Sequence, residues 1–177
     1  MKALVIFLSV IILAYTYRGA EKITAGSPVS ADSQFVQEAS SINLGEIHIS
    51  NIAVMKGSGV IKHLAEQIRQ DRTAAQQHLV GLAQNLRYPV EPGIDSGYQA
   101  KATQLNTPGN NDFDSAYLSQ VTEGHDKAIA IFETQAGTGT NLQLVEYANT
   151  QLSVLRQHRM MADSITRLLL MQGIVRN

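Results

Sequence analysis

Besides Gln151, a lesser break in the last stretch, four large polar side chains interrupt four stretches of apolar residues at helical spacing, one in each stretch. They are Glu46, Arg72, His125 and His158, and each lies near the middle of its stretch. The midpoints of all four helices share one height in an antiparallel bundle, so we expect these side chains to meet in one layer of the core. Burying a polar group is costly unless it is paired, so the four must satisfy one another or bind a ligand.

One interpretation of this layer is structural. The carboxylate of Glu46 and the guanidinium of Arg72 would form a buried ion pair, and the imidazoles of His125 and His158 would hydrogen-bond around it. Polar core layers of this kind fix the register of packed helices at some cost in stability. We favour this interpretation, which requires no cofactor.

The alternative is a divalent-metal site. Glu46, His125 and His158 would supply a carboxylate and two imidazoles, with Asp71 or Asp126 as a further ligand from the flank. Such donors suit Zn²⁺, Fe²⁺, Mn²⁺ or Cu²⁺. Arg72 counts against this alternative because it only donates hydrogen bonds, keeps its positive charge and repels a cation. The sequence leaves both interpretations open.

The elements that must position these side chains are helices. From Asp32 onward, apolar residues recur alternately three and four positions apart, which places them on one face of a helix. Glycine-containing segments at 57–59 and 137–139 interrupt this spacing and predict two tight turns. We therefore expect two antiparallel hairpins in one bundle over residues 32–173, with helices at about 32–56, 58–86, 111–136 and 140–172.

The connection between the two hairpins is long and rich in proline and glycine. Residues 87–110, fully extended, reach about 79 Å, whereas a helix of about 28 residues is about 42 Å long. This connection can therefore run the whole length of the bundle and leave the second and third helices parallel, with a short extra helix at 96–105. The expected fold is an all-α, ferritin-like four-helix bundle with one long crossover.

A targeting segment precedes the expected bundle. Residues 1–20 begin with a positive charge and continue as an apolar stretch from Ala3 to Tyr17, shorter than the ~20 residues that span a membrane. We expect a cleaved signal peptide or, as the alternative, a retained anchor that associates with the membrane through residues 3–17. Residues 21–31 are polar, contain Gly and Pro, and are expected to form a linker.

Composition and motifs exclude several classes of function. The net charge is −1 and no basic stripe is present, so nothing indicates a nucleic-acid partner. The chain has no cysteine, which excludes disulfides, thiolate metal sites and a cysteine nucleophile. It also lacks the Glu-x-x-His pairs of di-iron sites and the common hydrolase and phosphate-loop motifs. We therefore expect a protein that is not an enzyme.

Several blocks of this sequence also carry a family resemblance. They lie within residues 32–165, and the most specific is FDxxYLxxVxxxH, from Phe113 to His125, followed by Phe132-Glu133. These blocks resemble the bacterial family called domain of unknown function 4142, whose members are often labelled predicted outer membrane proteins and are regarded as ferritin-like. The resemblance implies both the fold and export to the bacterial envelope.

The resemblance also bears on the polar layer. The family usually carries a Glu in its first helix, Asp-His in its second, and one His in each of the next two. Glu46, Asp71, His125 and His158 match this pattern, whereas Arg72 stands where histidine is usual. This departure counts against an inherited metal site.

Taken together, these observations predict an exported protein, located in the periplasm, at the outer membrane or outside the cell. Its body is expected to be a structural or interaction bundle with a buried polar layer of Glu46, Arg72, His125 and His158. The alternative is a metal-binding ferritin-like protein that uses Glu46, His125 and His158.

Overall fold

The computed structural model describes residues 30–91, 93–107 and 113–173. Within these residues all regular structure is helical, and no helix combines the length and apolarity needed to cross a bilayer. The expected targeting segment, residues 1–20, lies outside the described residues, as does nearly all of the expected linker. The helices are α1 (Ala31–Lys56), α2 (Gly59–Leu86), α3 (Ser96–Asn106), α4 (Phe113–Thr138) and α5 (Leu142–Met171).

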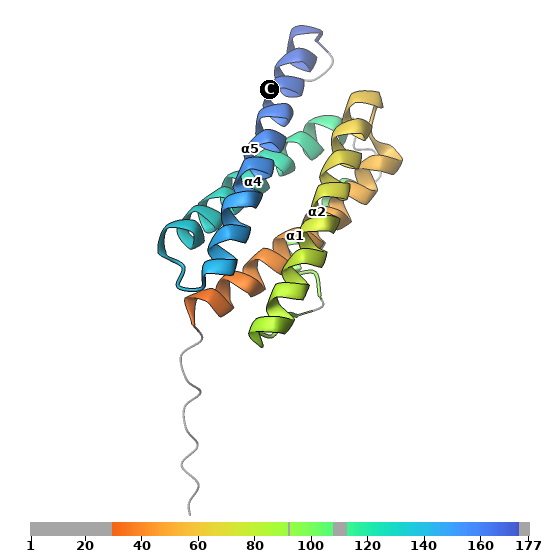
Figure 1. The fold of residues 1–177 in the computed structure, drawn as a ribbon. Coiled ribbons are helices and arrows are strands. Elements are labelled where there is room, and N and C mark those ends of the chain that lie inside the picture. Colours follow the sequence, from red (N-terminus) through yellow and green to blue (C-terminus); the bar gives the residue numbers. More distant parts are fainter. Residues whose placement is uncertain (1–29, 92, 108–112, 174–177) are drawn as a thin grey trace, which may run out of the picture.

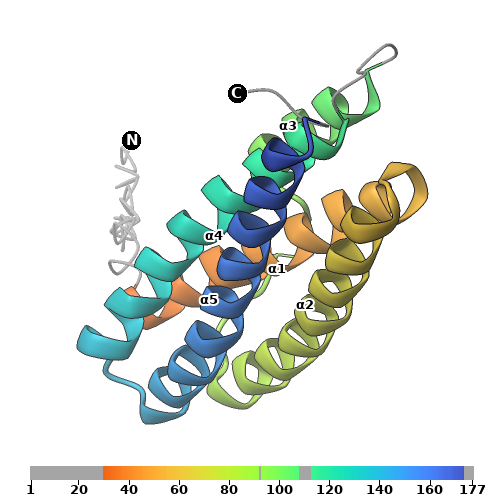
Figure 2. The ribbon, with the colours of Figure 1, turned by 90° about the horizontal axis from the view of Figure 1, so that it is seen from above.

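The four long helices form a bundle of two hairpins (Figure 1). α1 packs against α2, and α4 packs against α5, while α1 also contacts α4 and α2 also contacts α5. Gly57 separates α1 from α2, and Asn141 starts α5 by accepting hydrogen bonds from the N–H groups of Gln143 and Leu144. Figure 2 shows the two hairpins side by side when the bundle is turned. The predicted all-α four-helix bundle is therefore confirmed.

Asp32 joins the start of α1 to the turn between α4 and α5. Its buried carboxylate accepts hydrogen bonds from Gln135 Nε2 (2.7 Å), the Thr140 N–H and hydroxyl (3.2 and 2.6 Å) and the Asn141 N–H (2.9 Å). Burial raises the pKa of this carboxyl, but the hydrogen bonds outweigh burial and the pKa lies below its ordinary value. Because the start of α1 meets the end of α4, these helices are antiparallel, and α2 and α4 run parallel as the long crossover predicts.

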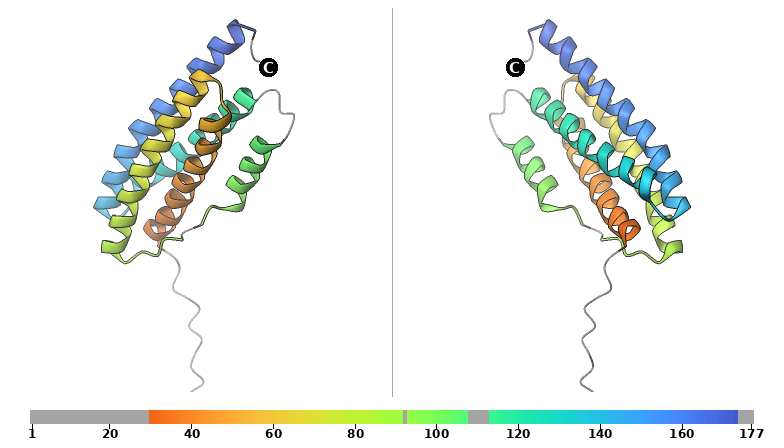
Figure 3. Two further views of the ribbon diagram at one scale, coloured as in Figure 1. Left: turned by 90° about the vertical axis from the view of Figure 1, so that its right-hand side faces the viewer. Right: turned by 90° about the vertical axis from the view of Figure 1, so that its left-hand side faces the viewer.

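The crossover carries a short helix on the outside of the bundle. Figure 3 shows α3 lying apart from the four long helices, and it contacts only α1 and α4 among the principal helix pairs. Asp95 caps it by accepting from the N–H of Tyr98 at 3.0 Å and also accepts a hydrogen bond from the Ser41 hydroxyl of α1. Tyr98, Ala102 and Leu105 form its buried face. The extra helix expected at 96–105 is confirmed.

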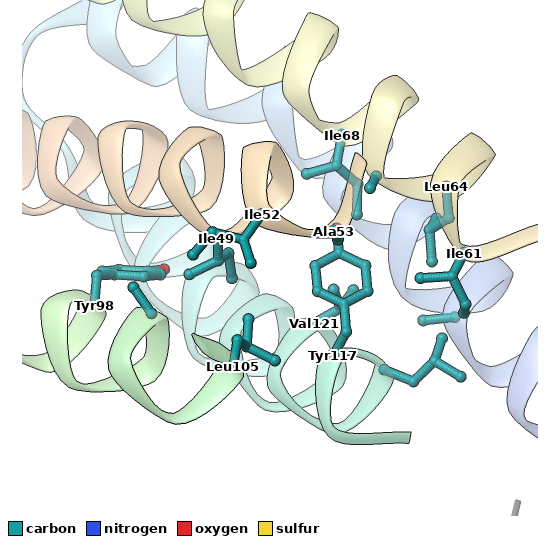
Figure 4. Packing of buried hydrophobic residues seen from close by; sticks show 14 of the residues in the cluster. Ile49, Ile52, Ala53, Ile61, Leu64, Ile68, Tyr98, Leu105, Tyr117 and Val121 are labelled. Atoms are coloured by element: carbon teal, nitrogen blue, oxygen red, sulfur yellow. The ribbon is translucent and has the colours of Figure 1, made fainter. Parts of the chain in front are cut away.

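The core of the bundle consists of two apolar clusters rather than one. The cluster in Figure 4 includes Ile61, Leu64 and Tyr117 and lies toward the turn between α1 and α2. The second lies toward the other end and includes Phe35 and Phe132, whose rings meet edge to face at 5.1 Å. Along each long helix, residues of one cluster precede the middle and residues of the other follow it. The segment between the clusters is where the polar layer was predicted.

The Asp32 contact predicts a large effect of a single substitution. Asp32→Ala removes a charged acceptor and leaves several buried donors unpaired, so we expect it to lower the free energy of unfolding by about 2–3 kcal/mol. Urea denaturation followed by circular dichroism measures this loss. Glu133→Ala is the control, because Glu133 is an exposed carboxylate in an ion pair with Arg156 at 2.7 Å and should change stability by less than about 0.5 kcal/mol. Equal losses in both variants would contradict the role given to Asp32.

Candidate functional site

The structure places Glu46, Arg72, His125 and His158 together in the core. Their exposed fractions are 2%, 0%, 1% and 0%, respectively. They come from α1, α2, α4 and α5 and lie between the two apolar clusters, at the middle of each long helix. Each of the four long helices therefore contributes one of these side chains to the same site.

The contacts among these side chains cross each neighbouring pair of long helices. Glu46 Oε2 on α1 lies 3.7 Å from Arg72 Nε on α2, and Glu46 Oε1 lies 3.3 Å from His125 Nδ1 on α4. His125 Nε2 is 3.3 Å from His158 Nδ1 on α5, and His158 Nε2 is 2.8 Å from Asp71 Oδ2 on α2. This series of contacts begins at Arg72 and ends at Asp71, and both residues lie next to each other on α2, so the series closes on itself. We call these five residues the polar ring.

The two histidines require one more proton than two neutral imidazoles supply. His125 Nδ1 lies 2.9 Å from the carbonyl oxygen of Val121, and His158 Nε2 faces Asp71, so both outer nitrogens face acceptors and need hydrogen. The inner contact, from His125 Nε2 to His158 Nδ1, is a hydrogen bond only when one of these nitrogens is protonated as well. Two neutral imidazoles carry one N–H proton each, so one of these three contacts has no hydrogen to form a hydrogen bond.

Burial opposes this third proton. It lowers the pKa of His125, an effect that Glu46 counteracts and Arg72 reinforces. Burial, followed by the charges of His125 and Arg72, lowers the pKa of His158 to about 4 despite its hydrogen bond to Asp71. We therefore assign the pair as neutral at neutral pH and as sharing a third proton only in acid.

Glu46 and Arg72 are close to each other without being hydrogen-bonded. A separation of 3.7 Å permits an ion pair but exceeds hydrogen-bond length. Within the described residues, both carboxylate oxygens of Glu46 and all three guanidinium nitrogens of Arg72 lack a hydrogen-bond partner. His125 does not satisfy Glu46, because its Nδ1 is directed at the carbonyl of Val121. The described residues therefore leave donors and acceptors of this buried pair unpaired, and buried groups of this kind are commonly bridged by water.

A second buried network lies beside the ring, and sequence reasoning missed it. The side-chain amide of Asn43 donates to Gln76 Oε1 at 3.2 Å and to the Tyr147 hydroxyl at 3.1 Å. Gln76 donates to Ser40 Oγ at 2.9 Å, and the Tyr147 hydroxyl donates to the carbonyl of Ala75 at 3.3 Å. Ser, Asn and Gln are ordinary on exposed helix faces, so their types alone do not distinguish them from surface residues.

α3 covers the ring on the side where α1 meets α4. The ring of Tyr98 lies directly against Gly45, where a Cβ atom would overlap it. Burial raises the pKa of Tyr98, and the nearby Glu46 carboxylate adds to this, so the hydroxyl keeps its proton. Lys101 Nζ lies 5.0 Å from the centre of the Tyr98 ring, and burial lowers the pKa of this amine. The signal available in the sequence was a glycine, Gly45, in the middle of a helix.

The polar ring is a poor fit to a metal ion in this arrangement. Within the described part of the chain, no group of three or more His, Asp or Glu side chains is placed to hold one. The nitrogens of His125 face Val121 and His158 rather than a common centre, and the Arg72 guanidinium lies beside the Glu46 carboxylate. The ligand set Glu46, His125 and His158, with Asp71, stays a prediction.

Sequence comparison decides the family. Residues 19–165 match the family model described as Domain of unknown function (DUF4142). The chain belongs to this family. This match covers the polar ring and all five helices up to the last part of α5, and it confirms the resemblance drawn from the sequence blocks. A search of curated proteins gives no match.

A solved structure shares the fold of this DUF4142 chain. It is the crystal structure of a DUF305 fragment from Deinococcus radiodurans, with a TM-score of 0.68 and 13% sequence identity. The similarity covers 78% of this chain and 97% of the fragment. At this identity the comparison supports the helical bundle and carries no information about the side chains of the polar ring.

The buried histidines predict a loss of stability in acid. The folded-state pKa of His158 lies below its ordinary 6.5, so the unfolded chain takes up protons first as the pH falls. Stability present above pH 6.5 is therefore lost as the pH falls from there to about 4, by about 2–3 kcal/mol. Urea titrations across this range measure the loss. His158→Asn should make the free energy of unfolding less dependent on pH. The control His63→Gln, at an exposed histidine, should keep the pH dependence of the parent protein. The same pH dependence in all three proteins would contradict this assignment.

Proposed function

We propose that this chain is an exported envelope protein whose bundle serves as a non-enzymatic structural or interaction module. In this proposal the polar ring fixes the register of the four long helices, and its four buried members present no reacting group to a substrate. The observation that carries the proposal is the closure of the ring: Glu46, Arg72, His125 and His158 are all at least nine-tenths buried and face one another.

The surface hollows support this proposal because they lie elsewhere. A groove of about 520 Å³ between α1 and α3 is lined by His48, Gln99 and Thr103, among others. Another, of about 440 Å³, lies against α2 and includes Val80 and Tyr88. A catalytic group must be reachable by its substrate, and neither of these hollows includes a member of the polar ring.

Metal binding is the competing proposal, and one observation favours it. Glu46, His125 and His158 are in contact, and the oxygens of Glu46 lack hydrogen-bond partners within the described residues. A cation at Glu46 would have to displace the guanidinium of Arg72, which lies at 3.7 Å. Stoichiometric metal in protein purified natively, together with thermal stabilisation by added Zn²⁺, Cu²⁺ or Fe²⁺, would overturn the structural proposal in favour of this one.

A pair of substitutions tests the structural role of the ring. Arg72→Met leaves the Glu46 carboxylate buried without its partner charge, so we expect a loss of about 3–5 kcal/mol in the free energy of unfolding. The double variant Glu46→Leu/Arg72→Met removes both charges and should recover most of this loss. Chemical denaturation of the two variants and the parent measures the coupling. If the double variant is as unstable as the sum of the single ones, the two side chains do not act as a pair.

Export is tested separately on the native protein. Mass spectrometry of the N-terminus from fractionated cells should find the protein in the envelope fraction without residues 1 to about 20. An intact Met1 or Lys2 in the membrane fraction would instead identify the alternative anchor at residues 3–17. Full-length protein confined to the cytosol would contradict export in either form.

A further inference from the structure

Gly124 leaves a small space between α1, α3 and α4 that is lined by polar atoms. A Cβ atom built on Gly124 would have three nearest neighbours, and none of them is carbon. They are Lys101 Nζ at 3.7 Å, Glu46 Oε1 at 3.8 Å and Tyr98 Oη at 4.0 Å. We call this space the Gly124 niche. Two helices, α1 and α3, thus direct three polar atoms to one buried position beside Gly124 of α4.

Steric crowding does not account for a glycine here. At Gly45 a Cβ atom would overlap the Tyr98 ring, so close packing requires glycine at that position. At Gly124 the same atom would make ordinary van der Waals contacts, and the residue lies inside α4, where glycine destabilises a helix relative to alanine. A methyl group would fit the Gly124 niche, but it could not form hydrogen bonds with the polar atoms around it.

The polar atoms of the niche are complementary to a water molecule. Glu46 Oε1 is a buried acceptor without a hydrogen-bond partner in the described part of the chain. The Lys101 ammonium donates hydrogen bonds, and the Tyr98 hydroxyl can donate or accept. A buried water needs two to four polar partners, and the niche supplies three.

We infer that the Gly124 niche is a binding site for one water molecule that bridges Glu46 to Tyr98 and Lys101. This water donates to Glu46 Oε1 and accepts from the Lys101 ammonium, which is partly exposed at the surface. Two of its three partners belong to α3, so the site is complete only while α3 is docked. The site links the polar ring to solvent on the side opposite Asp71, and it is independent of the function proposed above.

Serine and alanine substitutions at Gly124 test this site. The serine hydroxyl can replace the bound water, whereas the alanine methyl displaces it and leaves Glu46 Oε1 without a donor. We therefore expect Gly124→Ser to unfold at a higher urea concentration than Gly124→Ala. Helix propensity alone predicts the reverse order, with alanine favoured about twofold in the folding equilibrium.

Gly81 provides the matched control. It lies inside α2, is exposed, and a Cβ atom there would meet nothing within 4 Å. Gly81→Ala should therefore be more stable than Gly81→Ser. If alanine exceeds serine by the same margin at both positions, the Gly124 niche is ordinary packing space and the inference is wrong.

A crystal structure of the parent protein provides a second test that does not depend on the variants folding. It should contain an ordered water within about 2.7–3.2 Å of Glu46 Oε1, Lys101 Nζ and Tyr98 Oη. In crystals of Gly124→Ser, the serine Oγ should occupy that position. A niche filled instead by a protein side chain, or one with no ordered water at a resolution where other buried waters are seen, would overturn the inference.

Discussion

The polar ring couples the four long helices because its contacts join α1 to α2, α1 to α4, α4 to α5 and α5 to α2. Sliding any helix by one residue moves its side chains by about 1.5 Å along the axis, which is enough to break contacts of this length. The apolar clusters on either side are less selective, since leucine, isoleucine and methionine, which have similar volumes, exchange places with limited loss. In the structural role proposed for the ring, the register of the bundle therefore depends on the ring more than on the clusters.

The other buried polar features of the bundle fit around this constraint. Asp32 joins the start of α1 to the turn before α5 at one end of the bundle. Gly45 lies one residue before Glu46, so Tyr98 can lie flat on α1 and cover the Glu46 side of the ring. The crossover thus does more than connect the hairpins, because its helix places Tyr98 over the Glu46 side of the ring.

Much of this arrangement was predictable because it follows from periodicity. Breaks in the apolar spacing at Glu46, Arg72, His125 and His158 are enough to place these residues at one height once the helices are known to be antiparallel. The directions of their hydrogen bonds were not predictable, since they depend on side-chain rotamers. His125 Nδ1 faces the carbonyl of Val121 as well as Glu46, a choice that no spacing rule contains. Asp71 was expected only as a flanking metal ligand, whereas it accepts a hydrogen bond from His158.

The residue at position 72 determines whether such a ring contains its own cation or would favour a bound proton or metal ion. With Arg72 present, the layer contains its own cation beside Glu46, and the buried charges of these two residues cancel. With a histidine at this position, the carboxylate would face imidazoles that are neutral at neutral pH. A buried carboxylate without a cation is costly, so that version of the ring would favour protonation or uptake of a metal ion. The guanidinium of Arg72 removes this need, which is the physical reason why we propose a structural role for the ring in this chain.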